Sequence, residues 1–364
     1  GSNYKYKVIV TFSDVRAREI YDDMKSFDPN TFYYPPKDFI FFSADAYGNL
    51  IIQQRLDAVS HLISGEEFTL ITTIDGLMDR LVPLDLIRKN CIHLSYDDTI
   101  DVEELKTALV NSGFERTEQV ETAGQFAVRG GIIDIFPMTG DVPYRIELWD
   151  DVIDSIRSFD ALSQRTIENI DDIVIYPASE YILSQEEIAR GIEKIREEAS
   201  LREKTLRESF HTEEAHRLSV CINEFTERLS ISRTGVFLDS FMTYFYPETM
   251  TLPDYFPAEE TIFFIDEPGR IEERANTVET EFRESMINRI EGGYMLSGQT
   301  SVFCDTAEAL ARLASVRTVL FTTLEQKLKH FKPKNNYYIS MRNINPYNNS
   351  FELLVHDLQR YKKE

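Results

Sequence analysis

Residues 116–165 constrain this chain more than any other stretch, because they read as a compact set of short strands joined by glycine and aspartate turns. The stretch holds Trp149, the only tryptophan of the sequence. Its basic residues are all arginine, since no lysine occurs between Lys106 and Lys194. Protein interfaces favour arginine and tryptophan over lysine, so this composition indicates a docking surface. The turn positions are Gly124, Gly130, Gly131 and Gly140.

The run Tyr144–Trp149 has two faces, because side chains alternate across a strand. The apolar face comprises Tyr144, Ile146 and Leu148. The other face comprises Arg145, Glu147 and Trp149. Arg129 ends an earlier strand (126–129), and we expect its side chain to lie on this same face. A tryptophan beside arginines on an exposed face predicts a covering partner. A structural β domain whose arginines pair with its own acids is the alternative.

Composition and charge limit the remaining functions. The 364 residues are ample for two or three domains. The formal net charge of −23 repels nucleic acid over long range, although a local basic groove escapes that argument. Three scattered cysteines (Cys91, Cys221 and Cys304) predict no disulfide framework, no metal site and a reducing compartment, which we take to be the cytoplasm. No apolar run is long enough to span a membrane, so no membrane partner is expected.

The order of elements predicts a parallel α/β layer that is interrupted and then completed. Strands alternate with helices up to Cys91–Tyr96, which reads as a further strand of this layer. A small antiparallel β domain follows, and then a helical pair whose start is marked by the capping box at Ser184 and Glu187. The α/β pattern returns from about Gly235. The expected domains are the first part of the α/β layer at 3–97 and the inserted β domain at 98–180. Residues 181–345 are expected to hold the helical segment and the second part of the α/β layer. Residues 346–364 are expected to start a linker or a further domain.

A nucleotide-hydrolysing site is not expected in this chain. The phosphate-binding loop needs a Gly-Lys dipeptide, and the sequence contains none. Asp266 and Glu267 end an apolar strand as in a Walker B motif, but this signal is weak alone and a proline follows. The six histidines are scattered and lack the spacing of metal ligands. We therefore predict no catalytic residue, no metal and no cofactor.

Two runs in this region resemble a known family. FAVRGGIIDIFP, followed by PYRIELWDDVIDSIRSFDALSQRT, is similar to the second domain of the bacterial transcription-repair coupling factors. That domain is shared with the excision-repair subunit UvrB. UvrB proteins typically carry an acidic residue after the first glycine of the VRG turn and a tyrosine-rich hairpin upstream. Here the turn reads VRGG, and the upstream run FYYPPKDFIFFSADAYGNLIIQQRLDAVSHL is closer to the coupling factors.

The resemblance implies a degenerate RecA- or helicase-like α/β domain, split by a β domain like the second domain of UvrB. In that family the β domain recruits UvrA, and the UvrA-binding positions match Arg129, Arg145 and Trp149 here. Asp266 and Glu267 resemble the remnant of a helicase motif. The chain is then expected to be the N-terminal piece of an ATP-dependent DNA translocase that acts on stalled RNA polymerase.

The same resemblance implies what the piece lacks. ATP and magnesium are expected only in motor domains beyond this chain, and RNA polymerase and DNA are expected to bind parts of the parent outside it. The parent's own C-terminal region is expected to mask the UvrA-binding surface. The alternatives are a UvrB-type helicase subunit, which predicts nucleotide binding, and a structural spacer, which predicts a packed Trp149.

Overall fold

The computed structural model describes residues 4–37, 45–231, 236–325, 328–339 and 350–362. The chain divides into two compact units, residues 1–330 and residues 331–364. The division into four domains that the sequence predicts stays a prediction.

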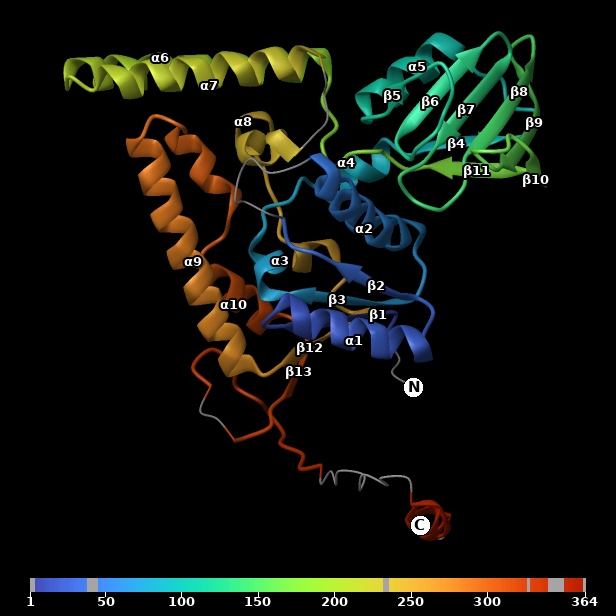
Figure 1. Cartoon of the computed structure of the whole chain (residues 1–364), viewed down its shortest axis with the longest axis vertical. Helices are drawn as coiled ribbons and strands as arrows, with labels where there is room; N and C mark the ends of the chain where they lie inside the picture. Colours follow the sequence, from blue (N-terminus) through green and yellow to red (C-terminus); the bar gives the residue numbers. More distant parts are fainter. Residues whose placement is uncertain (1–3, 38–44, 232–235, 326–327, 340–349, 363–364) are drawn as a thin grey trace. The chain divides into compact units, whose positions relative to one another are not determined.

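A five-stranded parallel sheet forms the α/β layer of the first unit, in the order β13-β12-β1-β3-β2 (Figure 1). Its strands are β1 (Tyr6–Thr11), β2 (Thr31–Tyr34), β3 (Phe68–Thr73), β12 (Thr261–Asp266) and β13 (Thr318–Phe321). β1 is entirely enclosed between β3 and β12, which explains its apolar, β-branched sequence. Since β12 and β13 follow the β domain in the chain, the predicted parallel α/β layer with an inserted β domain is confirmed.

Several helices begin where the sequence supplies a side-chain cap. α1 (Asp14–Phe27) starts after Ser13, whose hydroxyl accepts a hydrogen bond from the backbone N–H of Arg16. Its Ala17 packs on Tyr33 and Ile71, so α1 covers one face of the sheet. The further helices of the layer are α2 (Asp45–Ser64), α3 (Ile74–Met78), α4 (Leu84–Lys89), α9 (Pro268–Glu291) and α10 (Thr306–Ser315). α9 is tied to α3 by Arg274, which donates to Asp75 at 2.6 Å.

The inserted β domain is a six-stranded sheet in the order β10-β9-β8-β7-β6-β5. It comprises β5 (Glu115–Arg116), β6 (Gln125–Arg129), β7 (Ile132–Phe136), β8 (Tyr144–Trp149), β9 (Val152–Phe159) and β10 (Thr166–Ile170). All neighbours are antiparallel except β5 and β6. One face buries Phe126, Ile133 and Ile146 against Leu105 and Leu109 of helix α5 (Val102–Asn111).

One predicted strand lies in a different sheet from the one expected. β4 (Ile92–Ser95) does not join the parallel layer but pairs antiparallel with β11 (Asp172–Ile175). Of the residues of β4 only Leu94 is buried, and it packs in the core of the β domain. A strand of a parallel layer is normally buried on both faces, so this half-exposed pattern fits the two-stranded sheet.

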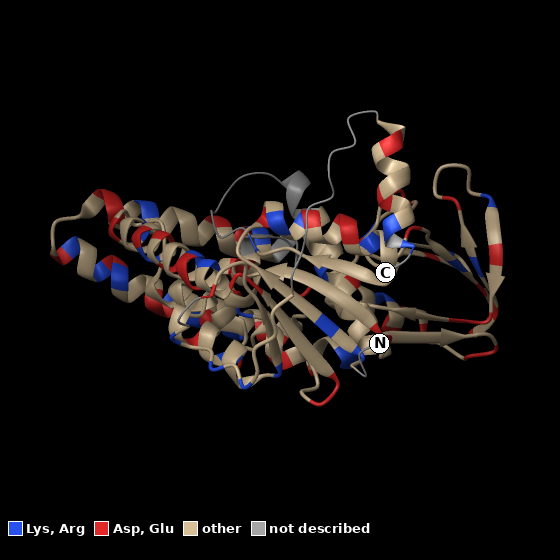
Figure 2. Cartoon of the chain, turned by 90° about the horizontal axis from the view of Figure 1, so that it is seen from below, with Lys and Arg blue, Asp and Glu red and all other residues tan. Residues whose placement is uncertain are grey.

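A helical pair and several short helices follow the β domain. The pair is α6 (Gln185–Glu208) and α7 (Thr212–Ile231), and the predicted capping box at Ser184 and Glu187 is confirmed. The short elements are η1 (Val236–Phe241), α8 (Met242–Phe245), η2 (Leu252–Tyr255) and η3 (Ser297–Val302). Acidic and basic residues are mixed along the helices, as Figure 2 shows. The second unit contains α11 (Phe351–Tyr361). Within the described ranges, no helix has the length and hydropathy needed to cross a membrane.

Five charged side chains meet where the chain leaves the β domain, and we call them the ionic cluster; four are buried, and Asp239 is partly buried. Its members are Lys37, Arg55, Asp79, Glu180 and Asp239. The two carboxylate oxygens of Glu180 lie 2.9 Å from Arg55 Nε and 2.9 Å from Lys37 Nζ. Arg55 also reaches Asp79, and Lys37 also reaches Asp239, each at 2.9 Å. The cluster thus ties the chain where it leaves the β domain to α2 and to η1.

Burial and pairing act in opposite directions on the acids of this cluster. Burial raises the pKa of Asp79 to about 7, although Arg55 and Lys37 oppose the rise. Burial also disfavours the charged form of Glu180, but here Arg55 and Lys37 prevail and lower its pKa to about 2. Glu180 is therefore firmly ionised at neutral pH and holds two buried cations.

Candidate functional site

The candidate site lies on the face of the six-stranded sheet opposite its apolar core, which we call the outer face. Strand pairing places Asp134 of β7 beside Arg145 of β8, and Arg145 beside Arg157 of β9. Ile132 lies two residues before Asp134 on β7, and it is paired with Arg129 of β6 and with Glu147 of β8. Side chains at paired positions share a face, so the register alone brings these charged groups together.

Asp134 is the centre of the outer face. Its carboxylate is fully buried and accepts hydrogen bonds from both Arg129 and Arg145. Arg145 binds it with two donors, Nε at 2.7 Å and Nη2 at 2.8 Å. Such a bidentate pair fixes the guanidinium in the plane of the carboxylate. The hydrogen bond that Arg145 donates to Asp134 is the main reason why the pKa of Arg145 is raised, so Arg145 stays charged.

Arg145 is less exposed than strand alternation predicts. Besides Asp134, its Nη2 donates to Gln164 at 2.8 Å, and its guanidinium lies 4.4 Å from the ring centroid of Phe159. Only 16% of its side chain is exposed, compared with 44% for Arg129. Arg145 is therefore mostly covered, and its guanidinium is fixed by contacts within the β domain.

Trp149 ends β8 and is 79% exposed. It pairs with Val152 across the two-residue turn Asp150–Asp151, in which Asp150 has a φ of 59°. Next to it on the outer face, Glu147 accepts hydrogen bonds from Arg157 and from Ser155. The turn leaves the indole in solvent at the end of a row of ion pairs.

The structure thus assembles the three predicted site residues unequally. Arg129 and Arg145 meet at Asp134, while Trp149 lies further along β8. Pairing of the arginines with acids of the same domain, the alternative reading of the sequence, is also present. Sequence reasoning missed Asp134 and Gln164. An acid inside the apolar strand 132–136 was the available signal for Asp134, because a buried carboxylate needs a cationic partner.

Comparison with known proteins covers the region that contains this face. Residues 92–181 match the family model described as the UvrB interaction domain, a range that runs from β4 past β11. The transcription-repair-coupling factor of Bacillus subtilis (strain 168) is 30% identical over 357 residues, which cover 98% of this chain and 30% of that protein. The chain resembles the N-terminal region of the transcription-repair coupling factors.

Other coupling factors are similar over nearly the same length of this chain. That of Staphylococcus epidermidis (strain ATCC 35984) is 28% identical over 367 residues, or 99% of this chain and 30% of the relative. That of Staphylococcus aureus (strain MRSA252) is 28% identical over 362 residues, or 97% of this chain. The chain spans about 30% of the length of the coupling factors that it matches.

Asp266 and Glu267, the Walker B-like acids, make hydrogen bonds within the chain. The resemblance to a helicase motif predicts them as its remnant. Asp266 accepts hydrogen bonds from Thr11 and from Arg16 Nε, each at 3.1 Å. Glu267 precedes α9 with a φ of 55°, and its carboxylate accepts from the backbone N–H of Thr323 at 2.8 Å. Within the described ranges, no group of three histidine, cysteine, aspartate or glutamate side chains is arranged to hold a metal ion.

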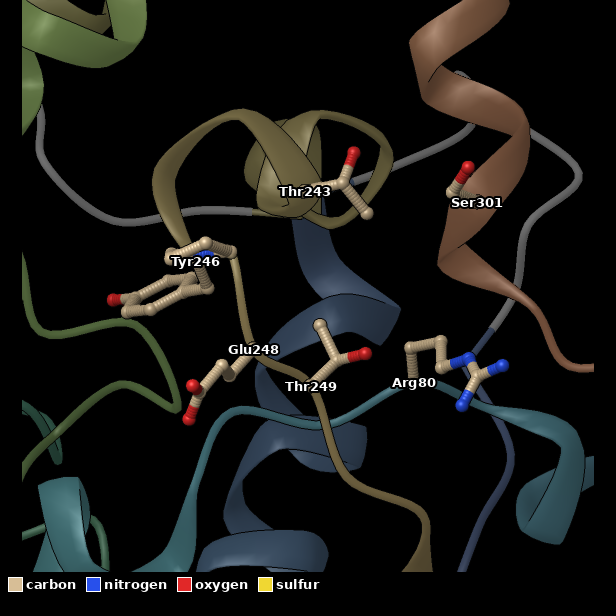
Figure 3. A pocket seen from close by; sticks show the side chains of 7 residues that line it. Arg80, Thr243, Tyr246, Glu248, Thr249 and Ser301 are labelled. Carbon is tan, nitrogen blue, oxygen red and sulfur yellow. The ribbon is translucent and has the colours of Figure 1, made fainter.

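A separate cavity of about 610 Å³ lies among η3, α8 and the loop after α3 (Figure 3). Figure 3 shows Thr243 and Ser301 on one side of it and Arg80, Glu248 and Thr249 on the other. Arg80 donates to both carboxylate oxygens of Glu308, so its charge is already compensated. The cavity contains none of the predicted site residues.

The exposure of Trp149 makes a simple prediction. Because it is the only tryptophan, its fluorescence reports one site. We expect a red-shifted emission typical of indole in water, with full access to iodide or acrylamide. A blue-shifted emission that these quenchers cannot reach would show that the indole is packed, as in the structural spacer.

Proposed function

We propose that the outer face of the β domain docks UvrA, and that this chain recruits UvrA in transcription-coupled nucleotide excision repair. One observation carries the proposal. Within the range that matches the UvrB interaction domain, a buried Asp134 holds two arginines, and further along β8 a tryptophan is 79% exposed. Tryptophan and arginine are the residues most enriched among those that dominate binding energy at interfaces.

The arrangement supplies two kinds of contact. Arg129 is 44% exposed, and the structure records one hydrogen bond from its five donors, so it can bind a carboxylate or carbonyl group of UvrA. Trp149 offers a large apolar surface that a partner would desolvate. Arg145, fixed by Asp134, adds a preorganised charge to the same face, and preorganisation lowers the entropic cost of binding.

The wider role follows from the similarity to the coupling factors. We propose that the parent protein is a cytoplasmic, ATP-dependent DNA translocase, that RNA polymerase and DNA bind its other regions, and that its C-terminal region masks the outer face. We also propose that this chain does not hydrolyse ATP by itself. The pairing of Asp266 with Arg16 and Thr11 supports the last point, because an acid that binds Mg²⁺ needs its oxygens available.

Titration calorimetry of the chain into UvrA from the same organism tests this function. Trp149→Ala is expected to weaken binding by about 2 kcal/mol or more, a change of about 30-fold in Kd. Phe27→Ala is the matched control, since Phe27 is an aromatic residue 87% exposed on α1, outside the β domain. Equal affinities of wild type and Trp149→Ala would remove Trp149 from the interface. An absence of binding in wild type would favour the structural spacer.

A further inference from the structure

The six-stranded sheet is only partly covered along the edge formed by β5 and β6. β5 consists of two residues, Glu115 and Arg116, which pair with Gln125 and Phe126 at the start of β6. The chain leaves β6 after Thr117, whose N–H still donates to the carbonyl of Phe126 at 2.9 Å. β6 continues to Arg129. Its second half therefore forms an open edge.

The hydrogen-bonding groups of Val128 point out of this edge. Gly124 N–H donates to Phe136, and the carbonyl of Gly131 accepts from Leu148, so Phe136 faces β6 and Gly131 faces β8. Alternation along β7 then directs Ile133 toward β8, which makes Val128 and Ile133 a pair without mutual hydrogen bonds. The carbonyl of Phe126 points away from β7, toward Thr117. Val128 lies two residues after Phe126, so its N–H and carbonyl point to the same side of β6. Within the described part of the chain, neither its N–H nor its carbonyl is hydrogen-bonded to a turn or loop beyond this edge.

An open groove of about 930 Å³ lies at this point. It is lined by Arg116, Thr117, Glu118, Gln119, Val128 and Arg129. Two of the lining side chains are cationic and one is anionic, in a chain whose net charge is −23. Arg129 belongs both to this groove and to the Asp134 site, so the groove continues the outer face.

We propose that an extended segment of UvrA adds to the sheet in this groove. Its backbone would exchange hydrogen bonds with Val128, and an acidic side chain beside them would bind Arg116. This inference rests on the proposed function and assigns Val128 and Arg116 to it. Strand addition at an open edge draws affinity from main-chain bonds and specificity from flanking side chains.

Two other occupants fit the groove less well. A second copy of the chain would bring Arg116 and Arg129 against the same arginines, because a symmetric contact repeats its own charges. Nucleic acid offers phosphate acceptors for the arginines, but not the alternating N–H and carbonyl groups that match Val128, and the net charge of −23 opposes its approach. A peptide segment carrying an acid satisfies both features.

The decisive variant is Val128→Pro. Proline removes the N–H of Val128, which takes no part in the ladder with β7, and proline is tolerated on edge strands whose N–H faces outward. We expect Kd for UvrA to rise at least tenfold in calorimetry, with an unchanged circular dichroism spectrum. Val128→Ala is the control for the side chain, which packs partly against the core, and it should bind within about twofold of wild type.

Arg116→Glu tests the charged part of the groove independently. We expect at least a tenfold rise in Kd, whereas Arg190→Glu, the same charge change at an exposed arginine of α6, should bind as wild type does. A folded Val128→Pro with wild-type affinity would overturn the strand addition. If Val128→Pro does not fold, wild-type affinity of Arg116→Glu overturns it instead. Loss of binding in Trp149→Ala alone would leave the proposed function standing, and a wild-type chain that does not bind UvrA would refute both.

Discussion

Arg145→Glu is expected to lower the free energy of unfolding of the β domain by about 3–5 kcal/mol as well as to abolish UvrA binding. Asp134 is fully buried, and Arg145 satisfies both of its carboxylate oxygens. A glutamate at position 145 would remove these donors and place a second carboxylate beside the first. Sequence alternation alone predicts a surface variant that loses only binding. The structure predicts a variant that loses both.

Urea unfolding followed by circular dichroism, together with calorimetry on UvrA, separates the two effects. Arg129→Ala is the informative control. Its side chain is 44% exposed, so its loss should cost at most about 1 kcal/mol of stability while still weakening UvrA binding. If Arg145→Glu were as stable as wild type, Asp134 could not be the buried anchor of the outer face.

Glu180→Gln is expected to destabilise the first unit by about 3–5 kcal/mol, because a buried ion pair that loses one partner leaves the other charge uncompensated. Here two cations are affected. Arg55 and Lys37 have 1% and 5% of their side chains exposed, and both are bound to Glu180 at 2.9 Å. Thermal or urea unfolding at pH 7 measures the change. A loss below about 1 kcal/mol would mean that Asp79 and Asp239 suffice to hold these cations.

Asp79→Asn provides the matched control, and its effect should depend on pH. The pKa of Asp79 is raised from 3.8 to about 7, so the folded protein binds this proton more tightly than the unfolded chain does. The stability of wild type relative to Asp79→Asn should therefore fall as pH rises from about 4 to about 7, and level off above. Glu180 behaves oppositely, because its lowered pKa adds stability that is lost only as pH falls from about 4.5 toward about 2. Unfolding curves from pH 4 to 8 test the sign.

Local signals in the sequence predicted much of the fold. Glycine turns and alternating residues located β6 and β8, and Ser184 with Glu187 marked the start of α6. The partner of Ile92–Ser95 was not predictable in the same way, because its mate, β11, lies almost 80 residues later. β10 was missed because its residues are mostly exposed and show no apolar alternation.

The sequence pointed to the residues of the candidate site but not to the contacts that the structure gives them. The resemblance and the alternation both pointed to Arg129, Arg145 and Trp149. Neither indicated that Gln164 and the ring of Phe159 would cover Arg145, because that depends on how the loop after β9 folds back. The ionic cluster was beyond local reasoning altogether, since Lys37 meets Asp239 across some 200 positions.

The pairing of β1 with β12 has a consequence for the order in which the chain can fold. Tyr6 lies beside Thr261, so the parallel layer cannot close until the ribosome has delivered more than 260 residues. The β domain needs only neighbouring hairpins and α5, and contacts so close in sequence form fast. During synthesis the β domain with its outer face is therefore complete before the parallel layer, and one edge of β1 stays unpaired until β12 is made. Nascent chains are most exposed to mispairing in that interval, at the strand that later becomes the centre of the sheet.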